Sequence, residues 1–286
     1  MKELSPAEIV LMRKAGEITR DALIYAETLV KPGISTNSLD KLISEYIIDK
    51  GGFPCFKNYC GYPKSTCISI NEVVVHGIPS ERKLKEGDIV SIDIGVDYKG
   101  YKGDAARTFA CGKISEEKQR LIDVTKECFF EGIKNLKAGE KLGKLSAAIQ
   151  KHAESNGYSV VRELCGHGIG QKMHERPNVL NYGRETDGPV MQANTCIAVE
   201  PMINMGRKEI FVLDDGWTTI TRDLQPSAHY ENTVLILADR VEILTLWKRK
   251  YGKAIWCCTF NSRKRYRLFI FDFFTVKHKF LFGCWW

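Results

Sequence analysis

Two carboxylates lie close together in the segment 89–109 (IVSIDIGVDYKGYKGDAARTF), and their spacing suggests metal chemistry. Apolar and polar residues alternate up to Val96, which predicts a strand with Asp93 on its more polar face. The next residues, Asp97-Tyr98-Lys99-Gly100, are typical of a type I turn. A hairpin about that turn pairs residues 97 with 100, 95 with 102 and 93 with 104, while a one-residue bulge makes Asp93 and Asp104 diagonal neighbours.

In either register the two carboxylates share one face of the hairpin, with Cβ atoms roughly 5–8 Å apart. Like charges at that spacing repel, so the hairpin favours a cation or a shared proton between them. A divalent metal ion relieves the repulsion, because hard oxygen ligands suit it. The alternative is that both side chains point into water, as most aspartates do.

Three later segments add residues of the types that bind metals. The segment LCGHGIG places His167 among three glycines, which let a backbone approach a ligand closely, and His174 follows seven residues later. The segment TCIAVEP is an apolar strand that ends in Glu200, and HYENTVLIL is a strand with Glu231 near its start. Taken singly, these residues are also explained as a structural histidine and as glutamates that reach solvent.

Together the segments supply four carboxylates and one imidazole, each on or beside a predicted strand: Asp93, Asp104, His167, Glu200 and Glu231. This composition is typical of a hydrolytic site in which two cations about 3.5–4 Å apart share carboxylates and a water. Oxygen-rich ligation with one histidine favours Mn, Fe or Co over a zinc site with thiolates.

The elements that position these residues follow one plan twice. Ser5-Pro6-Ala7-Glu8 is a capping box that starts a helix, and a second helix ends at Gly51-Gly52. Ser115 starts a helix in the second half, and the helix after it ends at Asn156-Gly157. Strand-rich sequence follows each helix pair, the second run reaching about Leu246. The repeat predicts two fused half-domains that share one sheet, with a site at their junction.

Composition narrows the class of protein. The chain of 286 residues has a net charge of +7, but residues 247–286 hold ten Lys or Arg and one Asp, so removing that +9 leaves residues 1–246 at −2. A near-neutral body gives no reason to expect specific DNA binding. The sequence has no signal-peptide core and no apolar run of transmembrane length, so we expect a cytoplasmic protein whose ten cysteines are reduced.

Five separated motifs resemble the methionine aminopeptidases of the short, type I bacterial form: SxCISINEVVVHGIP, DIGVDYKGYKGDAARTF, CGHGIG with a following His, VEPM and YENT. The resemblance covers residues 1–246. It implies an α/β (α+β) pita-bread fold, with two pseudo-symmetric helix-helix-strand halves around a central curved antiparallel sheet. It makes the five residues above the metal ligands of two divalent ions (Co, Mn, Fe, Ni or Zn), and leaves room for an additional monovalent cation.

The resemblance also implies the reaction. A monomer would remove the initiator methionine from nascent polypeptide N-termini when the second residue is small, by a metal-activated bridging hydroxide, with ribosome contact as an option. Glu200 would act as general base and acid, His174 would donate to the developing oxyanion, and His76 would contact the scissile nitrogen.

The methionine pocket of the family corresponds here to six residues: Tyr59, Tyr62, Cys67, His76, Met173 and Trp217. Aromatic and sulfur walls suit a flexible, polarizable thioether. Ordinary core packing is the alternative for the aromatic residues. Met173 departs from the family pattern, since bacterial relatives often carry an aromatic residue there.

Two other functions are open at this point. A proline-directed peptidase on the same fold generally has an extra N-terminal domain, whereas the first helix here begins at Ser5. A non-catalytic binding module usually lacks several of the ligands.

The C-terminal segment 247–286 resembles nothing in the family. It contains thirteen aromatic and ten basic residues without a clear period, so we predict poor order apart from a short strand in 268–276. One interpretation is a basic aromatic arm for ribosomal RNA or an anionic membrane. The other is an extension without function.

Overall fold

The computed structural model describes residues 2–134 and 136–247, which form one compact unit. Its helices are α1 (Pro6–Leu29), α2 (Thr36–Asp49), the short 3-10 helix η1 (Tyr59–Gly61), α3 (Glu116–Ile133) and α4 (Gly143–Ser155). Its strands are β1 (Phe53–Pro54), β2 (Cys67–Ile70), β3 (Val73–Val75), β4 (Ile89–Tyr98), β5 (Tyr101–Ala110), β6 (Ser159–Val160), β7 (Gly166–Gly168), β8 (Glu175–Val179), β9 (Thr195–Val199), β10 (Met202–Asn204), β11 (Ile210–Val212), β12 (Thr219–Thr221), β13 (Ser227–His229), β14 (Asn232–Ile236) and β15 (Val241–Ile243).

Helices α1 and α3 begin at their predicted caps. Ser5 Oγ accepts a hydrogen bond from Glu8 N (3.4 Å), and Glu8 Oε2 accepts one from Ser5 N (2.8 Å), so the predicted capping box of α1 is confirmed. Ser115 caps α3 in the same way by accepting from Lys118 N. Each cap satisfies backbone N–H groups that have no partner within their helix.

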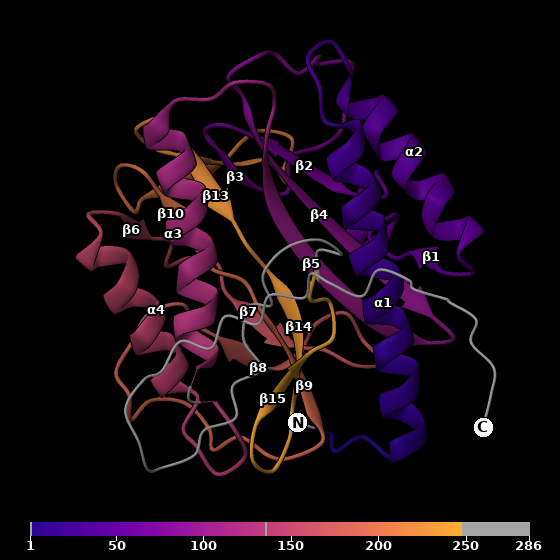
Figure 1. Cartoon of the computed structure of the whole chain (residues 1–286), viewed down its shortest axis with the longest axis vertical. Helices are drawn as coiled ribbons and strands as arrows, with labels where there is room; N and C mark the ends of the chain where they lie inside the picture. Colours follow the sequence, from indigo (N-terminus) through magenta and orange to yellow (C-terminus); the bar gives the residue numbers. More distant parts are fainter. Residues whose placement is uncertain (1, 135, 248–286) are drawn as a thin grey trace, which may run out of the picture. The chain divides into compact units, whose positions relative to one another are not determined.

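The helix pairs cover two separate groups of strands (Figure 1). Helices α1 and α2 pack against β4 and β5, where the alternating side chains Val90, Ile92, Ile94 and Val96 are all buried in one core. Helices α3 and α4 pack around Phe129 in a second core, together with side chains from β9, β10, β13 and β14. The predicted helix-helix-strand plan is therefore present twice.

Every strand pairing among the described residues is antiparallel, in four sheets. The two larger sheets are β1-β4-β2 with β5 beside β4, and β15-β14-β9-β7-β8. The three-stranded sheets are β13-β10-β6 and β11-β12-β3. No helix among residues 2–134 and 136–247 is long and apolar enough to cross a membrane.

The β4–β5 hairpin differs from its predicted register. Gly95 pairs with Asp104 and Asp93 with Ala106, so the predicted pairs, including Asp93 with Asp104, are wrong by two positions. A shift of two keeps each side chain on its face, because successive side chains of a strand alternate. The two carboxylates therefore still share a face, as diagonal neighbours.

The turn accounts for the shift. Lys99 and Gly100 both have positive φ (52° and 89°) and form a two-residue turn, in place of the predicted type I turn over 97–100. Turns with two positive φ values match the right-handed twist of the flanking strands, whereas a type I turn splays them. Asp97 Oδ1 accepts from Gly100 N (2.7 Å), so the aspartate stabilises the turn from within the strand.

Of the segment predicted as a tail, only Trp247 is described. Its ring centroid lies 6.3 Å from that of Phe109, beside the core of the first half. The predictions for 248–286, including the strand in 268–276, lie outside the described residues.

Candidate metal centre

The five predicted ligands come from both halves of the fold. Asp93 and Asp104 lie on β4 and β5, in the sheet of the first half. His167 lies on β7, Glu200 directly follows β9, and Glu231 lies between β13 and β14. Because β7, β9 and β14 are neighbours in one sheet, these last three side chains are brought together by the second half.

A ladder of hydrogen bonds joins β5 to the segment 229–233. Thr233 Oγ1 accepts from Asp104 N and donates to Asp104 O (both 2.9 Å). Two residues along, Glu231 N donates to the carbonyl oxygen of residue 106 (3.0 Å). Two residues further, Thr108 Oγ1 accepts from His229 N (2.9 Å) and donates to His229 O (3.0 Å). The ladder fixes the acidic residues of the two halves in one register.

His167 occupies a strand with little room on either side. A Cβ on Gly166 would lie 2.3 Å from Ala198 O, and one on Gly168 would lie 2.4 Å from Arg176 O, so β7 fits between β8 and β9 only with glycine there. His167 Nδ1 donates to Gly168 O (2.9 Å). That bond fixes the neutral tautomer and leaves the lone pair of Nε2 free for a ligand.

The donor atoms around this lone pair are spaced for metal binding. His167 Nε2 lies 3.7 Å from Asp104 Oδ2 and 3.6 Å from Glu200 Oε1. Two donors that are each about 2.1 Å from one ion lie at most about 4.2 Å apart, and both distances fall below that limit. Asp104, His167 and Glu231 each offer one donor atom, all within 4.8 Å of one another. Asp93 belongs to a second such set, which also contains Glu231.

Burial makes the ionised form of this carboxylate cluster energetically unfavourable unless a cation is bound. Burial first, and then the neighbouring carboxylates, raises the pKa values of Asp93, Glu200 and Glu231 well above their ordinary range, and burial raises the pKa of Asp104 to about 7. Burial also lowers the pKa of His167 to about 4, so its imidazole is neutral. In the described part of the chain, one oxygen each of Asp93, Asp104 and Glu231 is buried without a hydrogen-bond partner.

These features fit divalent metal ions. A buried acceptor without a partner costs about 1–3 kcal/mol, and more when it is charged. A dication bound to the carboxylates would compensate both the missing hydrogen bonds and the repulsion between like charges. The neutral imidazole of His167 is the form that binds metals.

One residue of the cluster was missed by the sequence analysis. His229 Nε2 lies 3.7 Å from Glu231 Oε2 and 4.0 Å from Glu200 Oε2, and its side chain is 2% exposed. The available signal was its place two residues before Glu231, at the end of β13. A strand position of this kind does not by itself distinguish a ligand from a structural histidine.

The predicted pocket residues gather in one apolar cluster beside the carboxylates. Five of the six belong to it: Tyr59, Tyr62, Cys67, Met173 and Trp217. Cys67 lies opposite Asp93 in the pairing of β2 with β4. The Trp217 ring meets the Tyr62 ring edge to face at 5.1 Å and the His76 ring at 6.2 Å. A pocket wall and a packed core share this arrangement, so the pocket role stays a prediction.

The two remaining predicted histidines lie at the edge of the carboxylate cluster. His174 is exposed, its ring centroid lies 4.3 Å from that of His167, and its Nδ1 lies 2.8 Å from Tyr59 Oη. His76 directly follows β3 with φ at 59°, in the left-handed region that few residues other than glycine adopt. Burial lowers the pKa of His76, and partial removal of water from around the His174 ring lowers the pKa of His174.

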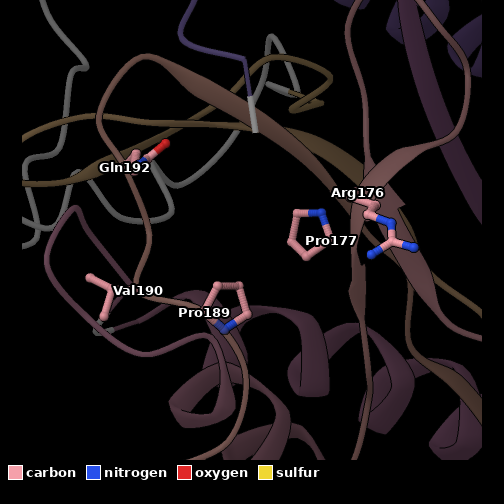
Figure 2. Close-up of a pocket in the computed structure, with 5 residues that line it drawn as sticks. All are labelled: Arg176, Pro177, Pro189, Val190 and Gln192. Atoms are coloured by element: carbon pink, nitrogen blue, oxygen red, sulfur yellow. The ribbon is translucent and has the colours of Figure 1, made fainter.

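A groove of about 230 Å³ elsewhere on the described residues contains none of the predicted site residues (Figure 2). It is lined by Arg176, Pro177, Pro189, Val190 and Gln192. This lining carries a single charged side chain and no carboxylate, so we assign the groove no chemistry.

Comparison with known proteins gives the same family throughout. Metallopeptidase family M24 matches residues 10–238. The chain is 51% identical over 241 residues to a methionine aminopeptidase of Clostridium perfringens, covering 84% of this chain and 97% of that protein. It is 44% identical over 246 residues to the methionine aminopeptidase of Escherichia coli, covering 85% and 93%.

Solved structures place the fold in the same group. Methionine aminopeptidase from Rickettsia prowazekii superposes with a TM-score of 0.85 at 42% identity, over 86% of this chain and 100% of that chain. Prolidase from Pyrococcus furiosus superposes with a TM-score of 0.70 at 22% identity, over 86% of this chain and 66% of that chain, and so shares the fold alone. The predicted pita-bread fold class is confirmed. The chain therefore belongs to metallopeptidase family M24, and within it to the methionine aminopeptidases.

Proposed function

We propose that this chain removes the initiator methionine from nascent polypeptides and peptides whose second residue is small. The observation that carries the proposal is the convergence of Asp93, Asp104, His167, Glu200 and Glu231, which the sequence scatters over both halves of the fold. Family membership supports a metal-dependent aminopeptidase. The second-residue preference, a cytoplasmic location, a monomeric state and contact with the ribosome belong to the proposal.

We assign the five side chains to two divalent ions. Asp104, His167 and Glu231 form one set of donors, and Asp93 contributes to the other, with Glu231 common to both. The oxygen-rich donor set favours Mn, Fe or Co. When bound, such ions polarise the scissile carbonyl and lower the pKa of water toward neutrality.

Side chains of the protein transfer the proton during the reaction. Glu200 accepts a proton from the attacking water and returns it to the leaving amine. In the chain without metal ions, burial and then the charge of Asp104 raise the pKa of Glu200 well above its ordinary range. Its Oε1 faces His167 and its Oε2 faces His229, so the carboxylate lies between the two imidazoles.

His174 acts on the substrate carbonyl. When its Nδ1 accepts a hydrogen bond from Tyr59 Oη, the neutral ring keeps its proton on Nε2. That N–H is then free to donate to the oxygen that becomes negative as the carbonyl is attacked. In the proposal His76 contacts the scissile nitrogen, and the pocket cluster encloses the methionine side chain.

A single assay tests catalysis. The full chain with Mn²⁺ or Co²⁺ is expected to release methionine from Met-Ala-Ser, and His167→Ala is expected to lower kcat/KM by at least two orders of magnitude. His152→Ala is the matched control, because His152 pairs with Glu127 at 3.0 Å and belongs to neither set of donors. Turnover by His167→Ala equal to that of the parent would refute the mechanism.

Substrate choice tests the activity within the family. Cleavage of Ala-Pro without cleavage of Met-Ala-Ser would assign the chain to the proline-directed branch. The same assays on a chain that ends at Trp247 test the proposal that residues 1–246 form the catalytic domain.

A further inference from the structure

His229 is buried and its outer ring nitrogen has no partner. The side chain is 2% exposed, and no hydrogen bond to Nε2 is formed by residues 2–134 or 136–247. A buried polar atom in that condition costs about 1–3 kcal/mol, so a native structure that keeps one usually has a use for it.

The backbone of His229 is held firmly. Thr108 on β5 both accepts from His229 N and donates to His229 O, at 2.9 and 3.0 Å. Thr233 makes the same pair of bonds with Asp104 at the other end of the ladder. The position of His229 is therefore fixed relative to the strand that carries Asp104.

His229 Nε2 faces carboxylate oxygens at distances that suit a shared ion and exceed those of hydrogen bonds. Nε2 lies 3.7 Å from Glu231 Oε2 and 4.0 Å from Glu200 Oε2. Hydrogen bonds from nitrogen to oxygen span about 2.7–3.2 Å, whereas two donors of one ion lie up to about 4.2 Å apart. Asp93, His229 and Glu231 together offer three donor atoms, all within 4.8 Å of one another.

We propose that His229 Nε2 is a protein ligand of the ion held by Asp93 and Glu231, in addition to the five ligands that the family resemblance implies. This inference rests on the proposed function, since it assumes two metal ions. Each donor set then contains one imidazole, His167 in one and His229 in the other, with Glu231 common to both. An added nitrogen donor shifts the metal preference of the Asp93 set toward ions that suit imidazole, such as Zn, Fe or Ni.

Calorimetric titration of the metal-free full chain with Co²⁺ tests the proposal, with His229→Gln as the variant and His152→Gln as the matched control. The parent is expected to bind two ions per chain. His229→Gln is expected to weaken one of the two steps at least tenfold and to leave the other within twofold, and the control to change neither. If both dissociation constants of His229→Gln for Co²⁺ lie within twofold of those of the parent, the proposal is wrong.

If His229→Gln fails to fold, nuclear magnetic resonance of the parent chain with ¹⁵N-labelled histidine provides an independent test. As Zn²⁺ is added to two equivalents, the Nε2 resonances of both His167 and His229 are expected to shift. An unchanged His229 resonance at two bound ions would overturn the inference. A parent that binds two ions and cleaves Met-Ala-Ser would then leave the proposed function standing, whereas a parent that binds no Co²⁺ and cleaves nothing would refute both.

Discussion

Removal of the metal ions should make the stability of this chain fall as the pH rises. Burial raises the pKa of Asp104 to about 7 from an ordinary value of 3.8. Between those values the folded state keeps a proton that the unfolded state has lost, so the free energy of unfolding decreases with pH. From pH 5 to 8 this residue alone lowers it by about 3 kcal/mol.

Other carboxylates of the cluster act in the same direction. The pKa values of Asp93, Glu200 and Glu231 are raised well above their ordinary range by burial and then by the charge of Asp104. For a domain of this size, each kcal/mol corresponds to about 2–4 °C in Tm, so the Asp104 contribution amounts to about 6–12 °C. With bound metal the sign reverses, because metal ions bind the ionised carboxylates and compete with protons.

Urea denaturation at pH 5, 6, 7 and 8, with EDTA or with Mn²⁺, measures both slopes. With EDTA, Asp104→Asn is expected to reduce the decrease in the free energy of unfolding between pH 5 and 8 by about 3 kcal/mol. With Mn²⁺, it is expected to abolish the increase in the free energy of unfolding over the same range. Asp239→Asn, at an exposed aspartate paired with Arg240, is the matched control and should change neither slope. A metal-free parent whose stability is constant or increases from pH 5 to 8 would refute the reasoning.

Three further substitutions test the ladder, the pocket and the orientation of His174. Thr233→Val removes both hydrogen bonds between β14 and β5 and should lower the free energy of unfolding by about 1–3 kcal/mol; a parent-like urea midpoint would contradict this. Gly95→Ala places a Cβ 2.4 Å from Phe56 Cε1, so it should lower the free energy of unfolding by about 1–3 kcal/mol and raise KM for Met-Ala-Ser. An unchanged KM would show that this contact does not shape the methionine pocket. Tyr59→Phe deletes the 2.8 Å hydrogen bond to His174 and should lower kcat about fivefold with little change in KM. A rise in KM of about fivefold would instead indicate that the Tyr59 hydroxyl contributes to substrate binding.

The features predicted correctly from the sequence depend on neighbours within a few residues. The capping box at Ser5 and the alternation that buries Val90 and Val96 both act within one element. The hairpin register was wrong, because a type I turn over 97–100 and a two-residue turn at Lys99-Gly100 share nearly the same residues. The deciding factor was the twist of the strands, which no single position of the sequence displays.

The site was predictable where a residue type stands out in its own strand, and His229 was missed because its role depends on a contact between distant strands. Glu200 directly follows the apolar strand β9 and Glu231 directly precedes β14, and a buried carboxylate at such a position already indicates a partner. A histidine beside Glu231 gains meaning only once Thr108 fixes it against β5. In that register the chain steps by two, so Asp104 faces Thr233, residue 106 faces Glu231, and Thr108 faces His229. A one-residue slip would turn Asp104 to the opposite face of β5, away from Glu231, so the hydroxyls at the two ends of the ladder hold the predicted ligands of the two halves in register.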